Sequence, residues 1–147
     1  MLRLCTKLTL IFVCVIFLTS CESNPIYYEI TLDAGNGRKI RIFANKDFDV
    51  SRSYYCKIYN KNIVEVPKSF LGGFGPREKP EFLMYKSADQ TIIGIYKKGQ
   101  PNKIIMLHDF STKENYPHGP DSYDGPESSK LRNKLLLKLQ KDFPGVN

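Results

Sequence analysis

The sequence lacks an apolar run long enough to cross a bilayer. The longest extends from Leu8 to Leu18, is interrupted only by Thr9, and falls short of the roughly 20 residues that a spanning helix needs. Cysteine is scarce, with 4 residues in the chain, so no disulfide framework is expected. The catalytic motif G-x-S-x-G and the calcium-loop motif D-x-[DN]-x-[DN]-G are both absent. We therefore predict no enzyme, no cofactor and no metal site from sequence motifs.

The amino-terminal segment is the most informative part of the chain. Arg3 and Lys7 precede the apolar run, which has the length of a secretory signal. The run ends in Leu18-Thr19-Ser20-Cys21. This order resembles the lipobox of bacterial lipoproteins, in which an apolar residue and two small residues precede a cysteine.

The resemblance covers about residues 1–21. It implies that residues 1–20 are a signal peptide, that Cys21 receives a diacylglyceryl group, and that signal peptidase II cuts before Cys21. In many bacteria an amide-linked chain such as palmitate is added to the new amino terminus. Two chains suffice for stable membrane anchoring, whereas one alone is marginal.

The residue after the lipidated cysteine bears on the destination of the protein. In the families that the lipobox resembles, aspartate at this position commonly retains a lipoprotein in the inner membrane. Here the position holds Glu22. The resemblance therefore favours the outer membrane in a host that has two membranes.

Removal of the signal changes the charge and the thiol content. Arg3 and Lys7 leave and no acid does, so the net charge falls by two, from +7 to +5. This charge permits attraction to anionic lipid, glycan or an acidic partner. No dense stripe of lysine and arginine interleaved with aromatics is present, which argues against nucleic acid. Cys56 remains as a thiol; we interpret it as a buried apolar residue, with pairing between chains as the alternative.

A short tether, residues 21–25, leads into one predicted small domain, residues 26–147. Its clearest element is a hairpin. Apolar residues alternate from Ile26 to Leu32 and again from Lys39 to Ala44, which predicts half-buried strands. Gly35-Asn36-Gly37 tolerates the positive φ of a tight turn between them.

A second hairpin is expected across residues 53–66, with Val64 and Val66 facing inward and Pro67 ending it. The three glycines between Phe70 and Pro76, together with Pro76, predict irregular structure. Three further strands are expected at even spacing, over residues 81–86, 91–97 and 103–110.

A polar loop, residues 111–125, precedes a helix predicted from Pro126 to about Phe143. Five apolar residues of this helix share one arc, and its lysines cluster on the opposite side as a solvated face. The apolar residues are Leu131, Leu135, Leu136, Leu139 and Phe143, and the lysines are Lys130, Lys134, Lys138 and Lys141. The fold class that follows is α+β, a mostly antiparallel meander of about six to seven strands with one amphipathic carboxy-terminal helix packed on the sheet. A small closed barrel capped by the helix is the alternative.

The favoured function is a non-enzymatic binding module of the accessory, inhibitor or immunity type. It would be held at the cell envelope by its lipid and would bind an envelope protein or a cell-wall component. This hypothesis depends on the strong anchoring signal, the small domain and the absence of a catalytic motif.

Two other functions stay open. One is a lipid-anchored hydrolase that uses His108 or His118, with the available nucleophiles being Ser111, Ser122 and Cys56. Adjacent residues on a strand point to opposite faces, so Asp109 is not expected to bond His108. The other is a cation-binding envelope protein that uses the loop from Asp121 to Glu127, where turn and helix-start chemistry is the simpler explanation.

Overall fold

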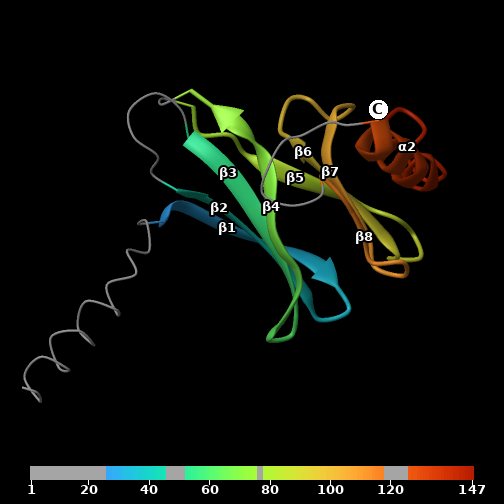
Figure 1. The fold of residues 1–147 in the computed structure, drawn as a ribbon, viewed down its shortest axis with the longest axis horizontal. Helices are drawn as coiled ribbons and strands as arrows, with labels where there is room; N and C mark the ends of the chain where they lie inside the picture. Colours follow the sequence, from blue (N-terminus) through green and yellow to red (C-terminus); the bar gives the residue numbers. More distant parts are fainter. Residues whose placement is uncertain (1–25, 46–51, 76–77, 118–125) are drawn as a thin grey trace, which may run out of the picture.

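The computed structural model describes residues 26–45, 52–75, 78–117 and 126–147. These residues form two four-stranded antiparallel sheets and one helix (Figure 1). The first sheet has the order β1-β2-β3-β4 and the second β5-β6-β7-β8. The elements are β1 (Ile26–Gly35), β2 (Arg38–Asn45), β3 (Arg52–Asn60), β4 (Ile63–Phe74), β5 (Phe82–Lys86), β6 (Ile92–Lys97), β7 (Ile104–Asp109), β8 (Glu114–Tyr116) and α2 (Pro126–Leu139).

The alternating pattern of β1 and β2 produces the expected hairpin. Ile30 pairs with Ile42 across the two strands, and Ile42 is fully buried while Glu29 on the opposite face is exposed. Asn36 and Gly37 form the turn with φ values of 53° and 75°. An asparagine and a glycine suit this left-handed backbone because both tolerate positive φ.

The first sheet extends further than the sequence predicts, because β4 runs through Pro67 and the glycine-rich stretch as far as Phe74. The expectation that Pro67 ends the strand was wrong, as was irregular structure from Phe70 to Phe74. β4 is an edge strand, so a proline without an N–H costs no ladder hydrogen bond on the open side. The register of β4 against β3 shifts along the pair, which accommodates residues that do not fit a regular ladder. Gly72 adopts a φ of +139°.

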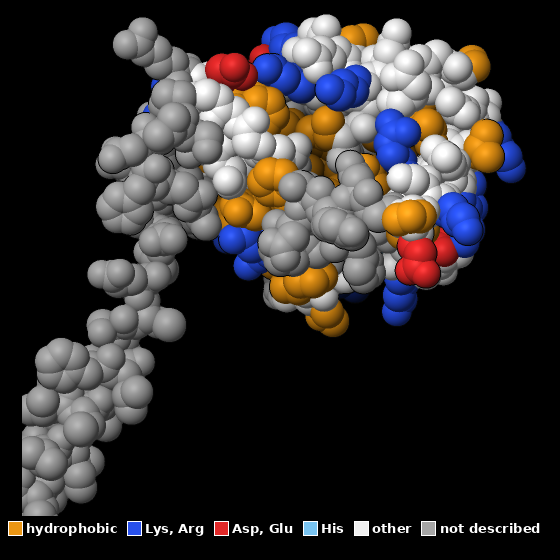
Figure 2. Space-filling view, turned by 45° about the horizontal axis from the view of Figure 1, so that its top comes forward, with side chains coloured by type: hydrophobic (Ala, Val, Ile, Leu, Met, Phe, Trp, Pro, Cys, Tyr) orange, Lys and Arg blue, Asp and Glu red, His pale blue; other side chains and the backbone are white. Residues whose placement is uncertain are grey.

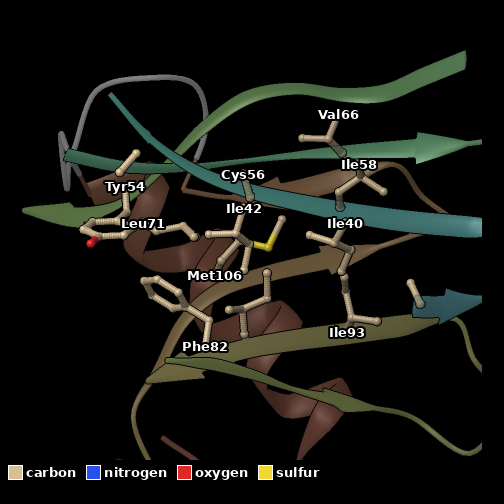
Figure 3. Packing of buried hydrophobic residues seen from close by; sticks show 13 residues of the cluster. Ile40, Ile42, Tyr54, Cys56, Ile58, Val66, Leu71, Phe82, Ile93 and Met106 are labelled. Atoms are coloured by element: carbon tan, nitrogen blue, oxygen red, sulfur yellow. The ribbon is translucent and has the colours of Figure 1, made fainter. Parts of the chain in front are cut away.

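The second sheet is covered on both faces. Its inner face packs against the first sheet around the core drawn in Figure 3, and α2 lies on its outer face (Figure 1). The expected six to seven strands become eight among the described residues because β8 lies inside the predicted loop 111–125. The barrel alternative was wrong, since the strands form two separate sheets. The expected antiparallel strands and the helix packed on a sheet are confirmed.

Helix α2 packs through three fully or nearly fully buried leucines, Leu135, Leu136 and Leu139. It approaches β6 closely at Gly94, where an added Cβ would lie 2.6 Å from Cδ2 of Leu139. The helix ends at Leu139, earlier than the expected Phe143. Phe143 lies in the following turn, where its N–H donates to the Leu139 carbonyl at 3.1 Å and its ring lies 4.5 Å from that of Tyr85.

Leu135→Ala should destabilise the protein by about 2–5 kcal/mol, because it leaves a cavity between α2 and the second sheet. Leu137 provides the matched control, since it lies on the same helix and is 65% exposed. Urea unfolding curves of the two alanine variants test this. Equal midpoints for Leu135→Ala and the wild type would contradict the packing of α2.

Candidate functional site

His108 and Asp109 are neighbours on β7 and make contacts on opposite sides of the second sheet. His108 is 2% exposed and its ring lies 4.7 Å from that of Phe110 in a T-shaped arrangement. Asp109 is 1% exposed and accepts a hydrogen bond from Lys138 of α2. Strand geometry predicts this separation, so the two residues do not form a catalytic pair.

The Asp109 carboxylate is held by donors from the turn that follows β7 and from the helix. Its Oδ1 accepts from the Ser111 backbone N–H at 2.8 Å, the Ser111 hydroxyl at 2.5 Å and the Thr112 N–H at 3.1 Å. Burial alone would raise the pKa of Asp109, but these hydrogen bonds and the one from Lys138 hold it well below its usual range. Asp109 is therefore an ionised structural link between β7 and α2.

This link corrects the prediction for Lys138. The helix lysines were expected to form a solvated face, and Lys134 fits that view because it is half exposed and bonds the surface residue Glu114. Lys138 differs, because its ammonium group is the partner of a buried carboxylate. That hydrogen bond also raises the pKa of Lys138.

On the other side of β7, a pocket of about 280 Å³ lies at the tip of the β3–β4 hairpin. We call it the tip pocket. Apolar and polar side chains both line it, the His108 imidazole among them, and Lys113 borders it from the β7–β8 turn. The lining residues are Asn60, Ile63, Val64, Glu65, His108, Phe110 and Lys113.

The carboxylate of the tip pocket, that of Glu65, is held by hydrogen bonds from two residues. Arg38 Nε donates to Glu65 Oε2 at 2.9 Å, and Asn60 Nδ2 donates to Glu65 Oε1 at 3.2 Å. The Arg38 guanidinium also lies 4.4 Å from the centre of the Phe110 ring. Burial pushes the pKa of Glu65 upward, but the bonds from Arg38 and Asn60 outweigh it and the pKa is lowered. Glu65 is thus ionised and already paired.

His108 is neutral at physiological pH. Burial lowers its pKa to about 4, and the nearby carboxylates of Glu65 and Asp109 offset only part of that effect. Its cross-strand partner Asn115 is anchored by bonds to the Ser69 hydroxyl at 2.9 Å and the Pro117 carbonyl at 2.7 Å. The imidazole therefore contributes a neutral polar surface to the pocket.

The described nucleophile candidates do not serve His108. The Ser111 hydroxyl donates to Asp109 on the far side of β7. Cys56 is a free thiol, fully buried between the sheets, and burial raises its pKa to about 12, so it is a core residue as interpreted from the sequence. Neither Ser111 nor Cys56 therefore forms a nucleophile–base pair with His108.

Several predicted site residues lie outside the described residues, namely Cys21, His118, Asp121, Ser122 and Asp124. Of the acidic residues in the proposed cation loop, only Glu127 is described, and it is exposed in the first turn of α2. Within the described ranges, no three His, Cys, Asp or Glu side chains gather as a metal site. No helix in that part of the chain is long and apolar enough to span a bilayer.

Comparison with known proteins gives no relative: no family model matches the chain, and no curated protein or solved structure is significantly similar to it. The site is therefore interpreted from its own residues.

Sequence reasoning identified His108 and missed the rest of the tip pocket. Arg38 and Glu65 are far apart in the chain, and no local pattern links them. Val64 was expected to face inward with Val66. Instead, β4 pairs Val66 with Ile58 but Val64 with Tyr59, and the intervening shift at Glu65 leaves Val64 46% exposed.

Lys138→Gln should destabilise the protein by about 1–3 kcal/mol, because it leaves the buried Asp109 carboxylate without its cation. This range is below that for a fully buried pair, since Lys138 is 38% exposed and water replaces part of the interaction. Lys134→Gln is the matched control and should unfold close to the wild type. Chemical denaturation at neutral pH measures both; a Lys138→Gln protein as stable as the control would refute the link.

His108 should make the protein less stable as the pH falls from about 6.5 to about 4. In that window the unfolded chain binds a proton at His108 and the folded chain does not, so protonation favours unfolding. The loss should approach about 3 kcal/mol at the lower end. Denaturant unfolding at half-unit pH steps measures the free energy of unfolding. This free energy should depend less on pH in His108→Gln than in the wild type, and identical slopes would exclude the buried neutral imidazole.

Proposed function

We propose that the chain is a bacterial envelope lipoprotein, anchored through acyl chains on Cys21, whose folded part is a non-enzymatic binding module. The anchoring half of this proposal is supported by the order of residues 1–21, which resembles a lipobox signal. β1 begins at Ile26, only a few residues after Cys21, so the module would be held close to the bilayer.

The observation that carries the binding half is the tip pocket. Its carboxylate is already paired with Arg38, its histidine is a weak base because burial lowers its pKa to about 4, and Ile63 and Val64 at its wall are exposed. A catalytic centre needs a free base beside a nucleophile, whereas a binding site needs an accessible, partly apolar concave surface. The tip pocket has the second set of properties.

The distribution of charge supports a protein or cell-wall partner over nucleic acid. On the face shown in Figure 2, lysine and arginine side chains are dispersed with hydrophobic side chains between them. A polyanion is usually met by a continuous basic patch. In a host with two membranes, Glu22 supports the outer membrane as the destination.

Cys21→Ser should abolish incorporation of labelled palmitate and leave the precursor unprocessed, because the thiol that accepts the diacylglyceryl group is missing. Cys14→Ser is the control, since that thiol lies within the proposed signal and its loss should leave labelling intact. Metabolic labelling, mass spectrometry and membrane fractionation read the result. A Cys21→Ser protein that is still lipidated and begins at residue 21 would disprove the anchor.

A further inference from the structure

The tip of the β3–β4 hairpin exposes apolar surface that the fold does not use. Ile63 is 74% exposed and Val64 is 46% exposed, and both line the tip pocket. Single exposed apolar residues are common on protein surfaces and need no explanation. Here, however, Ile63 and Val64 line the same pocket as Phe110, so the concave site includes exposed apolar surface.

The charge beside this surface is positive and available. Lys113 lines the tip pocket, and Lys61 lies in the turn between Asn60 and Ile63. Neither lysine has an ion pair within the described part of the chain. The acid of the pocket, Glu65, is neutralised by Arg38. An occupant that matches this site therefore carries negative charge around an apolar group.

The size of the tip pocket favours a protein side chain over a small molecule as its occupant. Its volume of about 280 Å³ is slightly below the roughly 300–1,000 Å³ that is typical of small-molecule sites. The aromatic ring in the lining, Phe110, is already contacted by the Arg38 guanidinium at 4.4 Å and by the His108 ring at 4.7 Å, which leaves less of it for a sugar ring. A single apolar side chain that projects from a protein segment fits both the volume and the apolar part of the lining, which Ile63, Val64 and Phe110 provide.

The tip lies at the far end of the first sheet from the start of β1. The pairs Gly35–Arg38, Arg38–Asn60 and Asn60–Ile63 are all at the tip, whereas Ile26 pairs with Asn45 at the other end (Figure 1). The 10 residues of β1 span about 33 Å at ~3.3 Å per residue. A lipid on Cys21 would be attached at the Ile26 end, so the tip would face away from the bilayer.

We propose that the Ile63–Val64 tip and the tip pocket dock an acidic segment of a protein partner, which inserts one apolar side chain beside Phe110 and pairs its carboxylates with Lys61 and Lys113. This inference rests on the binding role proposed above and adds the chemistry of the partner and the end of the molecule that meets it.

Fluorescence anisotropy with purified mature lipoprotein in detergent micelles tests the inference. The probe is a fluorescein-labelled pentapeptide with one leucine flanked by two acidic residues on each side. Two matched peptides replace the leucine by glycine or the acidic residues by lysine. The leucine-containing acidic peptide should bind more tightly than either, and its binding should weaken as salt is added, because the charges at the rim are exposed.

Variants locate the site. Ile63→Ser should weaken binding roughly tenfold, as expected for loss of one buried aliphatic contact. Lys113→Glu should weaken it several-fold and reduce its salt dependence. Leu137→Ser is the control, because Leu137 is similarly exposed, at 65%, but lies on α2; it should bind like the wild type. Circular dichroism melts verify that the variants are folded, and Val64→Ser replaces Ile63→Ser if the latter is not.

Three results would overturn the proposal: no binding of the acidic peptide at millimolar concentration, equal binding of the lysine peptide, or wild-type affinity in both the Ile63→Ser and the Lys113→Glu proteins. Palmitate labelling of Cys21 is independent of all three. Failure of the docking proposal is thus distinguishable from failure of the anchoring proposal.

Discussion

The structure depends on burial of both faces of the second sheet. Its central strands β6 and β7 carry nearly continuous apolar runs, and Ile92, Ile93, Gly94 and Ile95 are all buried in sequence. A strand with apolar residues on both faces requires cover on both sides. The first sheet supplies one cover and α2 the other, so this middle layer joins the helix to the first sheet.

The same constraint places the polar residues of β7. His108 faces the first sheet and meets the Arg38–Glu65 pair beneath the β3–β4 tip, whereas Asp109 faces α2 and bonds Lys138. One strand end therefore contributes to two different sites. The Asp109 side fixes the helix to the sheet, and the His108 side leaves a pocket that the core does not fill. Asp109, which stabilises the packing of the helix, and His108, which lines the proposed binding surface, are adjacent in sequence but lie on opposite faces of the sheet.

Much of the local structure could be predicted from the sequence, because short-range patterns determine it. The β1–β2 hairpin, the strands β5 to β7 and the start of α2 at Pro126 all follow from alternation, turn residues and helix-start residues. The course of β4 could not be predicted, since tolerance of Pro67 and Gly72 depends on the strand lying at an edge. Likewise, Val64 was misplaced because register shifts against β3 are set by pairing and not by the strand's own pattern.

For the candidate site the sequence provided His108 and its separation from Asp109, as well as the lipobox-like order before Cys21, which is a linear signal that needs no fold. It could not provide the pairing of Arg38 with Glu65, the buried partner of Lys138 or the exposure of Ile63. The two contacts join residues from different strands or layers, and they exist only once the two sheets and the helix have packed. The exposure of Ile63 is likewise set by what packs around it. Period and composition thus determined the elements and the expected anchoring, whereas tertiary packing alone decided which polar groups are paired inside and which apolar groups remain outside.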